Sequence, residues 1–123
     1  MRCYFSTSRN GTVHEPHDAT VSFVIPELSI TFRARFHGTQ AACEYASLLA
    51  LLEFVQINPT LFDDRTLEIL GDSFTVVNQL NNRMLCRREL EPMRNTAQIL
   101  RQKVPYTIGW IARSANPASR HPA

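Results

Sequence analysis

The chain lacks the features of a membrane, secreted or disordered protein. Its richest apolar run, residues 46–52, lies between Glu44 and Glu53 and is far shorter than the ~20 residues that span a bilayer. The amino terminus has no basic segment followed by an apolar core, so no secretory signal is expected. With 44% apolar and 20% charged residues, the 123-residue chain has the composition of a soluble globular protein. We therefore expect no membrane partner.

The sequence also lacks internal repeats and any sign of a second domain. We expect one domain over residues 1–113, followed by a loose tail over residues 114–123 that is rich in Pro, Ala and Ser. A domain of this size buries roughly two-thirds of its unfolded surface, so it needs no disulfide or metal to fold.

Cysteine is scarce. Cys3, Cys43 and Cys86 are odd in number, far apart, and form no C-x-x-C pair. This usage is typical of reduced thiols in a cytosolic protein, so we expect a cytoplasmic location and no zinc site. We interpret Cys43 as a small buried residue, because no His lies at a spacing that would activate it as a nucleophile.

Lysine is nearly absent, with one Lys against twelve Arg, and the charges are unevenly distributed. Residues 1–74 carry five Arg and nine acids, whereas residues 75–123 carry seven Arg, one Lys and two Glu. Arginine suits bidentate contacts to phosphate, so the basic second half hints at a polyanionic partner. A solvated basic face is the alternative interpretation.

Hydrophobic periodicity predicts the order β-β-β-α-β-α-α-β. The clearest strand spans residues 28–36, where apolar and polar residues alternate. Further strands are expected at residues 2–5, 20–25, 67–71 and 106–111, with a loop over residues 6–18. Thr39 and Ser73 are expected to cap helices over residues 40–57 and 74–80, and Pro92 lies in the first turn of a third helix. This order indicates an α/β fold with a mixed sheet and helices packed on it.

Two carboxylates stand out. Glu44 lies near the start of an otherwise apolar helix, and Asp72 follows a buried strand. Ligands in open α/β sheets bind beyond the carboxyl ends of strands, and converging carboxylates can hold Mg²⁺. The alternative is that both acids form local hydrogen bonds or face solvent.

Four segments, taken in order, match one known pattern. Tyr4-Phe-Ser-Thr-Ser is similar to a first strand that reads Tyr-Phe-Asp-Gly-Ser, and residues 39–49 match T-N-N-x-A-E-Y-x-A-L. Residues 72–81 match D-S-x-x-V-V-N-Q-L-N, and residues 110–116 match W-I-P-R-x-x-N. From about Tyr4 to Asn116 the chain thus resembles the ribonuclease H-like superfamily, type 1, which implies a mixed five-stranded sheet with helices packed on it.

The resemblance implies an incomplete active site. The family cleaves RNA in RNA–DNA hybrids with two Mg²⁺ ions held by four carboxylates, of which Glu44 and Asp72 are present. The first-strand acid falls on Ser6, and the last falls on Ser119 or, with the gap placed differently, on Arg120. Since a two-metal site needs both ions in place, we expect little or no nuclease activity and at most weak metal binding at Glu44 and Asp72. Mg²⁺ or Mn²⁺ is expected as a cofactor only if the chain is active.

The substrate-binding residues are also partly replaced, although the part that attracts phosphate survives better than the catalytic acids. The two Asn of the family pattern, which contact the minor groove, fall on Gln40 and Ala41, and only Gln40 can still donate a hydrogen bond. A basic loop is retained, with Arg83, Arg87 and Arg88. We therefore expect a degenerate family member that binds RNA–DNA hybrid or double-stranded RNA.

Two alternatives remain open at this point. One is an active ribonuclease H with a rearranged acid set, in which Glu15, Asp18 or an acid from a partner chain completes the site. The other is a structural or protein-interaction module, in which the strand at residues 28–36 lies at a sheet edge and pairs with a second copy. We interpret His14-Glu-Pro-His17-Asp as a polar loop rather than a metal cluster, and Trp110, Phe36 and the Met residues as core.

Overall fold

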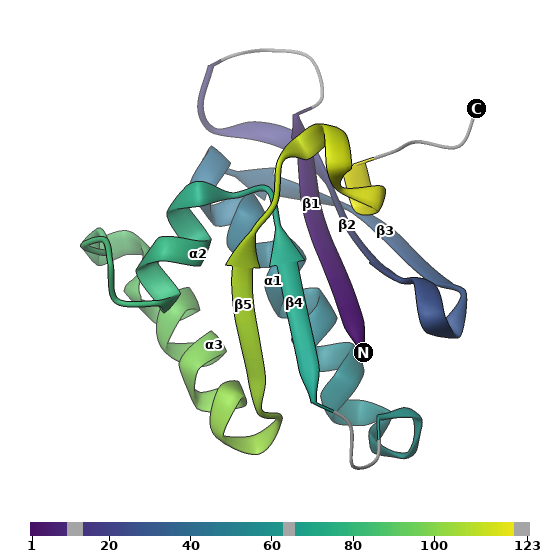
Figure 1. Ribbon diagram of the computed structural model, residues 1–123. Coiled ribbons are helices and arrows are strands. Elements are labelled where there is room, and N and C mark those ends of the chain that lie inside the picture. The colour runs from purple at the N-terminus through teal and green to yellow at the C-terminus, as the bar shows by residue number, and fades with distance from the viewer. Residues whose placement is uncertain (10–13, 63–65, 120–123) are drawn as a thin grey trace.

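The computed structural model describes residues 1–9, 14–62 and 66–119, which form one mixed sheet with helices on it (Figure 1). The strands are β1 (Arg2–Arg9), β2 (His17–Ile25), β3 (Ile30–Gly38), β4 (Leu67–Gly71) and β5 (Tyr106–Trp110). The helices are α1 (Gln40–Ile57), α2 (Phe74–Leu80) and α3 (Glu91–Lys103). The predicted order of elements is confirmed.

The sheet order is β3-β2-β1-β4-β5. The first three strands are antiparallel neighbours, whereas β4 runs parallel to both β1 and β5. The parallel part brings the carboxyl ends of β1 and β4 to one edge, with Phe5 beside Gly71 in the register. The predicted mixed five-stranded sheet is therefore confirmed, and its parallel centre is the part that creates a site.

Both predicted N-caps are confirmed. Thr39 Oγ1 accepts a hydrogen bond from the Ala42 amide at the start of α1, and Ser73 Oγ accepts one from the Val76 amide at the start of α2. These bonds satisfy backbone donors that have no partner inside the helix. The residues that follow Asp72 are thereby held in a fixed turn into α2.

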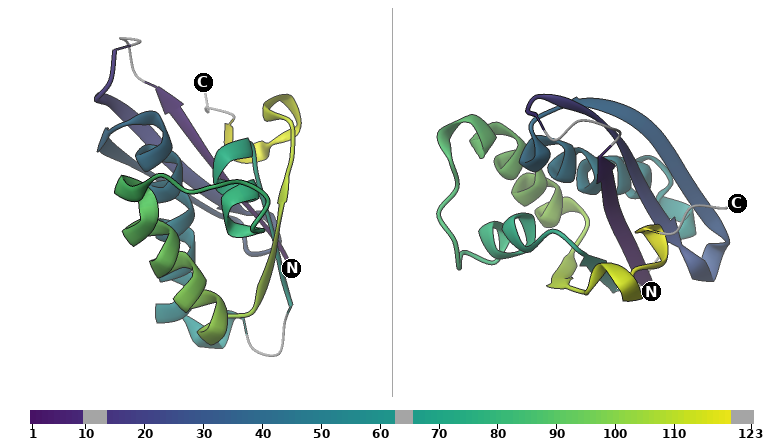
Figure 2. Two further views of the ribbon diagram at one scale, coloured as in Figure 1. Left: turned by 90° about the vertical axis from the view of Figure 1, so that its left-hand side faces the viewer. Right: turned by 90° about the horizontal axis from the view of Figure 1, so that it is seen from above.

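The core lies between the sheet and the three helices. Helix α1 contributes Tyr45, Leu48, Leu51 and Leu52, all of them fully buried, against Phe5 and Phe23 of the sheet. Figure 2 shows the helices on one side of the sheet and the C-terminal turns on the other side of β1. Among the described residues, no helix combines the length and apolar character that a bilayer crossing needs.

Two expectations about local structure were wrong. Residues 6–9 and 17–18 were expected in a loop, but they extend β1 and β2, because Ser6 to Arg9 pair with residues 19–22 of β2 and residues 17–18 pair with residues 37–38 of β3. Backbone pairing of this kind tolerates polar side chains. Trp110 and Met84 were expected in the core, but they are 53% and 37% exposed, because Trp110 lies at the end of the outer strand β5 and Met84 lies between α2 and α3.

Strand β3 is the other outer strand of the sheet, which is the position that pairing with a second copy requires. Arg33 and Arg35 lie on this strand. Positive charge on an outer strand is a common protection against edge-to-edge association. Pairing through β3 stays a prediction.

The C-terminal segment is more ordered than expected. Residues 113–115 and 117–119 form two short 3-10 turns, and the segment packs on β1 and β2. Asn116 is fully buried, where its side-chain amide donates to the Phe5 carbonyl and accepts from the Ala118 amide. Residues 114–119 are therefore docked rather than loose, while residues 120–123 lie outside the described residues.

We expect Asn116→Ala to lower the free energy of unfolding by about 2 kcal/mol, because the Phe5 carbonyl and the Ala118 amide lose a buried partner. Urea unfolding would measure the change. Asn95→Ala serves as the control, because Asn95 is exposed and its replacement should cost less than about 0.5 kcal/mol. Equal stability of the two variants would show that the segment does not dock on the sheet.

Candidate functional site

Asp72 lies where the parallel centre of the sheet ends. Its side chain is only 10% exposed, and its Oδ2 accepts a hydrogen bond of 2.9 Å from Ser6 Oγ on β1. Gly71 permits this arrangement, because a Cβ there would lie 2.2 Å from the Phe5 ring. The structure thus brings together Ser6 and Asp72, two of the positions that the sequence singled out.

Glu44 reaches the same edge from α1. Its Oε1 accepts a hydrogen bond of 3.2 Å from Gln40 Nε2, and its Oε2 accepts one from Ser73 Oγ. Since Ser73 directly follows Asp72 and also caps α2, one hydroxyl ties the acid of α1 to the start of α2. Glu44 thus bonds to the residue that follows Asp72, and both acids hydrogen-bond to side chains of the chain; a joint site for the two carboxylates stays a prediction.

Arg113 supplies a positive charge that the sequence analysis did not assign to the site. Its Nη1 lies 3.7 Å from Asp72 Oδ2 and donates to the Thr7 carbonyl, while its Nη2 donates to Ser8 Oγ at 2.7 Å. These bonds hold the guanidinium at the ends of β1 and β4. In the sequence, Arg113 could have been noticed as the last residue of the matched segment at residues 110–113, but that match gives no information on where its side chain points.

Ser119 does not join the carboxylates by hydrogen bonding. Its Oγ bonds to the backbone carbonyl oxygens of Arg113 and Asn116, both at 2.8 Å, and so closes the C-terminal turn. Arg120, the alternative position for the last acid, lies outside the described residues. The Ser119 side chain therefore has a structural role, and which of the two positions corresponds to the last acid stays open.

Glu44 and Asp72, with the side chains around them, are poorly suited to bind the two metal ions that the resemblance implies. Such a site needs several carboxylate oxygens free to bind cations, with no competing positive charge. Here Ser6 and Arg113 both face Asp72 Oδ2, and Glu44 accepts bonds at both oxygens. Within residues 1–9, 14–62 and 66–119, no three His, Cys, Asp or Glu side chains are grouped as metal ligands would be.

The side chains around Pro16 point to different partners. His17 is buried in β2 and its Nε2 lies 3.0 Å from Gln40 Oε1, whereas Asp18 pairs with His37 on β3 at 2.8 Å. Glu15 accepts from the Gln40 backbone amide at 2.8 Å. This spread fits the interpretation as a polar segment, although His17 and Asp18 belong to a strand rather than to a loop.

Gln40 is held on two sides. Its Oε1 faces His17, and its Nε2 donates to Glu44. One N–H of the Nε2 amide is left over after the bond to Glu44, so Gln40 retains a donor beside the acids.

Cys43 follows Ala42 on α1 and is fully buried. Burial raises the pKa of its thiol, and the negative charge of the neighbouring Glu44 raises it further. The thiolate is the nucleophilic form, so this cysteine is a poor nucleophile. Its interpretation as a small buried residue is confirmed.

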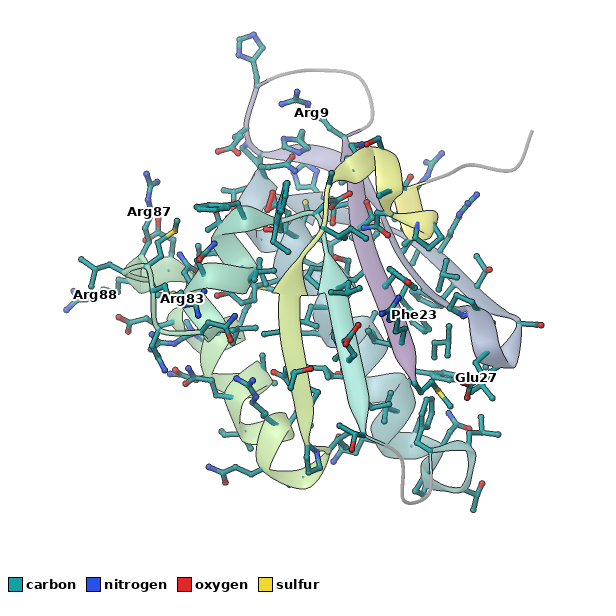
Figure 3. All side chains as sticks on the ribbon, in the orientation of Figure 1. Arg9, Phe23, Glu27, Arg83, Arg87 and Arg88 are labelled. Atoms are coloured by element: carbon teal, nitrogen blue, oxygen red, sulfur yellow. The ribbon has the colours of Figure 1, made fainter. Side chains whose placement is uncertain are left out.

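Arg83, Arg87 and Arg88 lie on the loop that joins α2 to α3 and are all exposed (Figure 3). The loop begins at Asn82, which has a left-handed backbone conformation, and the Arg83 amide donates to the Asn78 carbonyl at 2.8 Å. A hollow of about 460 Å³ separates this loop from the start of α1, and Gln40, Glu44 and Arg87 all line it. Glu44 and Arg87 of the basic loop therefore line one groove, whereas Asp72 is not part of its lining.

Comparison with known proteins places the fold. Neither a protein-family model nor a curated protein sequence matches the chain. Among solved structures, LC11 ribonuclease H1, isolated from compost, matches in its complex with an RNA/DNA hybrid at a TM-score of 0.77 and 18% identity, over 94% of this chain and 88% of that one. Ribonuclease H1 from the halophilic archaeon Halobacterium salinarum matches at a TM-score of 0.72 and 21% identity, over 93% and 88%.

A third structure, the N-terminal ribonuclease H domain of a Mycobacterium tuberculosis protein, matches at a TM-score of 0.70 and 18% identity. It covers 94% of this chain and 85% of that one. The predicted ribonuclease H-like fold is therefore confirmed. At these identities the likeness establishes the fold and leaves the activity to be argued from the site.

Proposed function

We propose that this chain, which has the ribonuclease H fold, binds nucleic acid, either RNA–DNA hybrid or double-stranded RNA, with little or no nuclease activity. The observation that carries the proposal is the contrast between the basic loop and the surroundings of Asp72. The basic loop is exposed and held by backbone hydrogen bonds, whereas Asp72 faces Arg113 and the hydroxyl of Ser6. One of the solved structures with this fold contains an RNA/DNA hybrid, which supports the choice of ligand.

Binding on this proposal requires no metal. Arg113 places a positive charge 3.7 Å from Asp72 Oδ2, which offsets part of the repulsion between this carboxylate and an approaching anionic backbone. Arginines of the loop attract the phosphates, and this attraction is expected to weaken steeply as salt rises, because counterions are released on binding. We further propose a cytoplasmic location, in keeping with the three free thiols.

An active enzyme is the rival function, and one observation favours it. Glu15 lines the same hollow as Glu44, so a third acid is near the site. Against it, the Glu15 carboxylate accepts a bond from the Gln40 amide, and Asp18 pairs with His37. Mg²⁺ or Mn²⁺ would be required only on this alternative.

We expect a labelled RNA–DNA hybrid to be retarded in a gel at low salt and to remain intact in Mg²⁺ or Mn²⁺. Retardation should be the same in EDTA, because the acids are not needed as metal ligands. Asp72→Asn is the control for contaminating nuclease. Cleavage that this substitution abolishes would establish the enzyme and overturn the proposal, as would binding that is absent at low salt.

A further inference from the structure

The basic loop carries an apolar ridge, Met84 and Leu85, between its arginines. Leu85 is 94% exposed, the highest exposure among the large apolar side chains that are exposed in the described residues, and Met84 is exposed as well. Single exposed apolar residues are common on protein surfaces, so the exposure alone identifies no site. The surroundings of the ridge are what distinguish it.

The ridge is held in place by the core. The Tyr45 hydroxyl donates to Gln79 Oε1 at 2.6 Å, and Gln79 Nε2 donates to the Leu85 carbonyl at 3.2 Å. Tyr45 and Gln79 are both buried, and burial raises the pKa of the Tyr45 hydroxyl, so it remains a donor. A loop fixed in this way loses little conformational freedom when it binds a ligand.

Two hollows border the ridge. One is the groove of about 460 Å³ that Glu44 and Arg87 line. The other is a hollow of about 370 Å³, lined by Asn82, Arg83 and Arg94. Met84 and Leu85 line both hollows, and each hollow therefore combines an apolar wall with arginine.

We propose that the Met84–Leu85 ridge is a binding site for unpaired nucleotides, which distinguishes bulged or gapped nucleic acid from a continuous duplex. This inference rests on the proposed nucleic-acid function. Bases enter the two hollows and contact the ridge through their apolar faces, while Arg83 and Arg87 contact the flanking phosphates. In a continuous duplex those faces are covered by stacking, so the ridge has no apolar surface to meet.

The two hollows favour nucleic acid over a lipid surface as the occupant. A membrane would contact the tip of the ridge and leave both hollows open, whereas a strand that crosses the ridge can use the arginines that line them. The second hollow is also lined by the polar side chains of Asn82 and Arg94. Apolar side chains such as Leu and Met make favourable contacts with bases that are not stacked on a neighbour.

The test compares two fluorescent probes by anisotropy at low salt: a continuous RNA–DNA hybrid, and the same hybrid with two unpaired nucleotides in its DNA strand. We expect the bulged probe to bind about fivefold more tightly. The double variant Met84→Gln, Leu85→Asn should lose this preference and keep its affinity for the continuous hybrid. Ile57→Asn is the matched control, because Ile57 is 75% exposed at the far end of α1.

Equal affinity of the native chain for the two probes would overturn the ridge proposal and leave the proposed function standing, whereas no binding of either probe would overturn both. A preference that survives in the double variant would also overturn the ridge proposal. Vesicles of phosphatidylserine and phosphatidylcholine form a further arm. Flotation with these vesicles that depends on Leu85, together with equal affinity for both probes, would assign the ridge to a membrane instead.

Discussion

Replacing Arg83, Arg87 and Arg88 together with glutamine is expected to weaken binding of an RNA–DNA hybrid on the order of 30-fold at low salt. All three side chains are exposed on one loop, so each is free to contact a phosphate. The slope of log affinity against log salt should fall by about three, because three fewer counterions are released. Fluorescence anisotropy at several salt concentrations measures both quantities.

The matched control removes three positive charges elsewhere. Arg2 begins β1, Arg35 lies on the outer strand β3, and Lys103 ends α3, so none of them belongs to the loop. Replacing these three with glutamine changes the net charge by the same amount. If the two triple variants lose affinity equally, the attraction comes from overall charge, and the loop has no special role.

Ser6→Asp is expected to make the stability of the chain depend on a divalent cation. Ser6 is buried, and its hydroxyl donates to Asp72 Oδ2. A carboxylate in its place would face a second carboxylate, and in EDTA we expect a loss of about 3 kcal/mol in the free energy of unfolding, because two buried negative charges would then share the single Arg113 guanidinium. Mg²⁺ should restore part of that loss, because a ligand that binds the folded state stabilises it.

Thermal unfolding in EDTA and in Mg²⁺ measures this effect. Ser6→Asn is the control for size, since it brings no charge, and its stability should not respond to Mg²⁺. A melting temperature of Ser6→Asp that is the same in both buffers would contradict the geometry described for β1 and β4. Cleavage of the hybrid by Ser6→Asp in Mg²⁺ would show that the serine at position 6 is what chiefly limits nuclease activity in the native chain.

Several features were readable from short stretches of the chain. The strand periodicity, the caps at Thr39 and Ser73 and the exact bounds of α1 depend on residues that are neighbours in sequence. The place of Asp72 at the carboxyl end of β4 was also predictable, because the end of a parallel strand is a topological position. The shortage of acids is a property of composition, since no Asp or Glu precedes Glu15 or follows Glu91.

Other features depended on contacts between distant residues. Arg113 lies beside Asp72 only because the C-terminal turns return across the end of β1, where Asn116 binds the Phe5 carbonyl. Bonds of a side chain to a distant backbone carbonyl leave no pattern in the sequence. The docked tail and the positive charge beside the acid were therefore decided by the tertiary structure.

The basic loop also has features that the sequence predicts and features that depend on contacts between distant residues. Its three arginines are visible in the sequence, but their number does not indicate whether the loop is held or where its apolar residues point. The bond from Gln79 to the Leu85 carbonyl, supported by Tyr45 of another helix, decides both. Composition and local pattern determined the fold and the placing of the acids along this chain, whereas side-chain contacts across the core decided which surfaces are presented to a ligand.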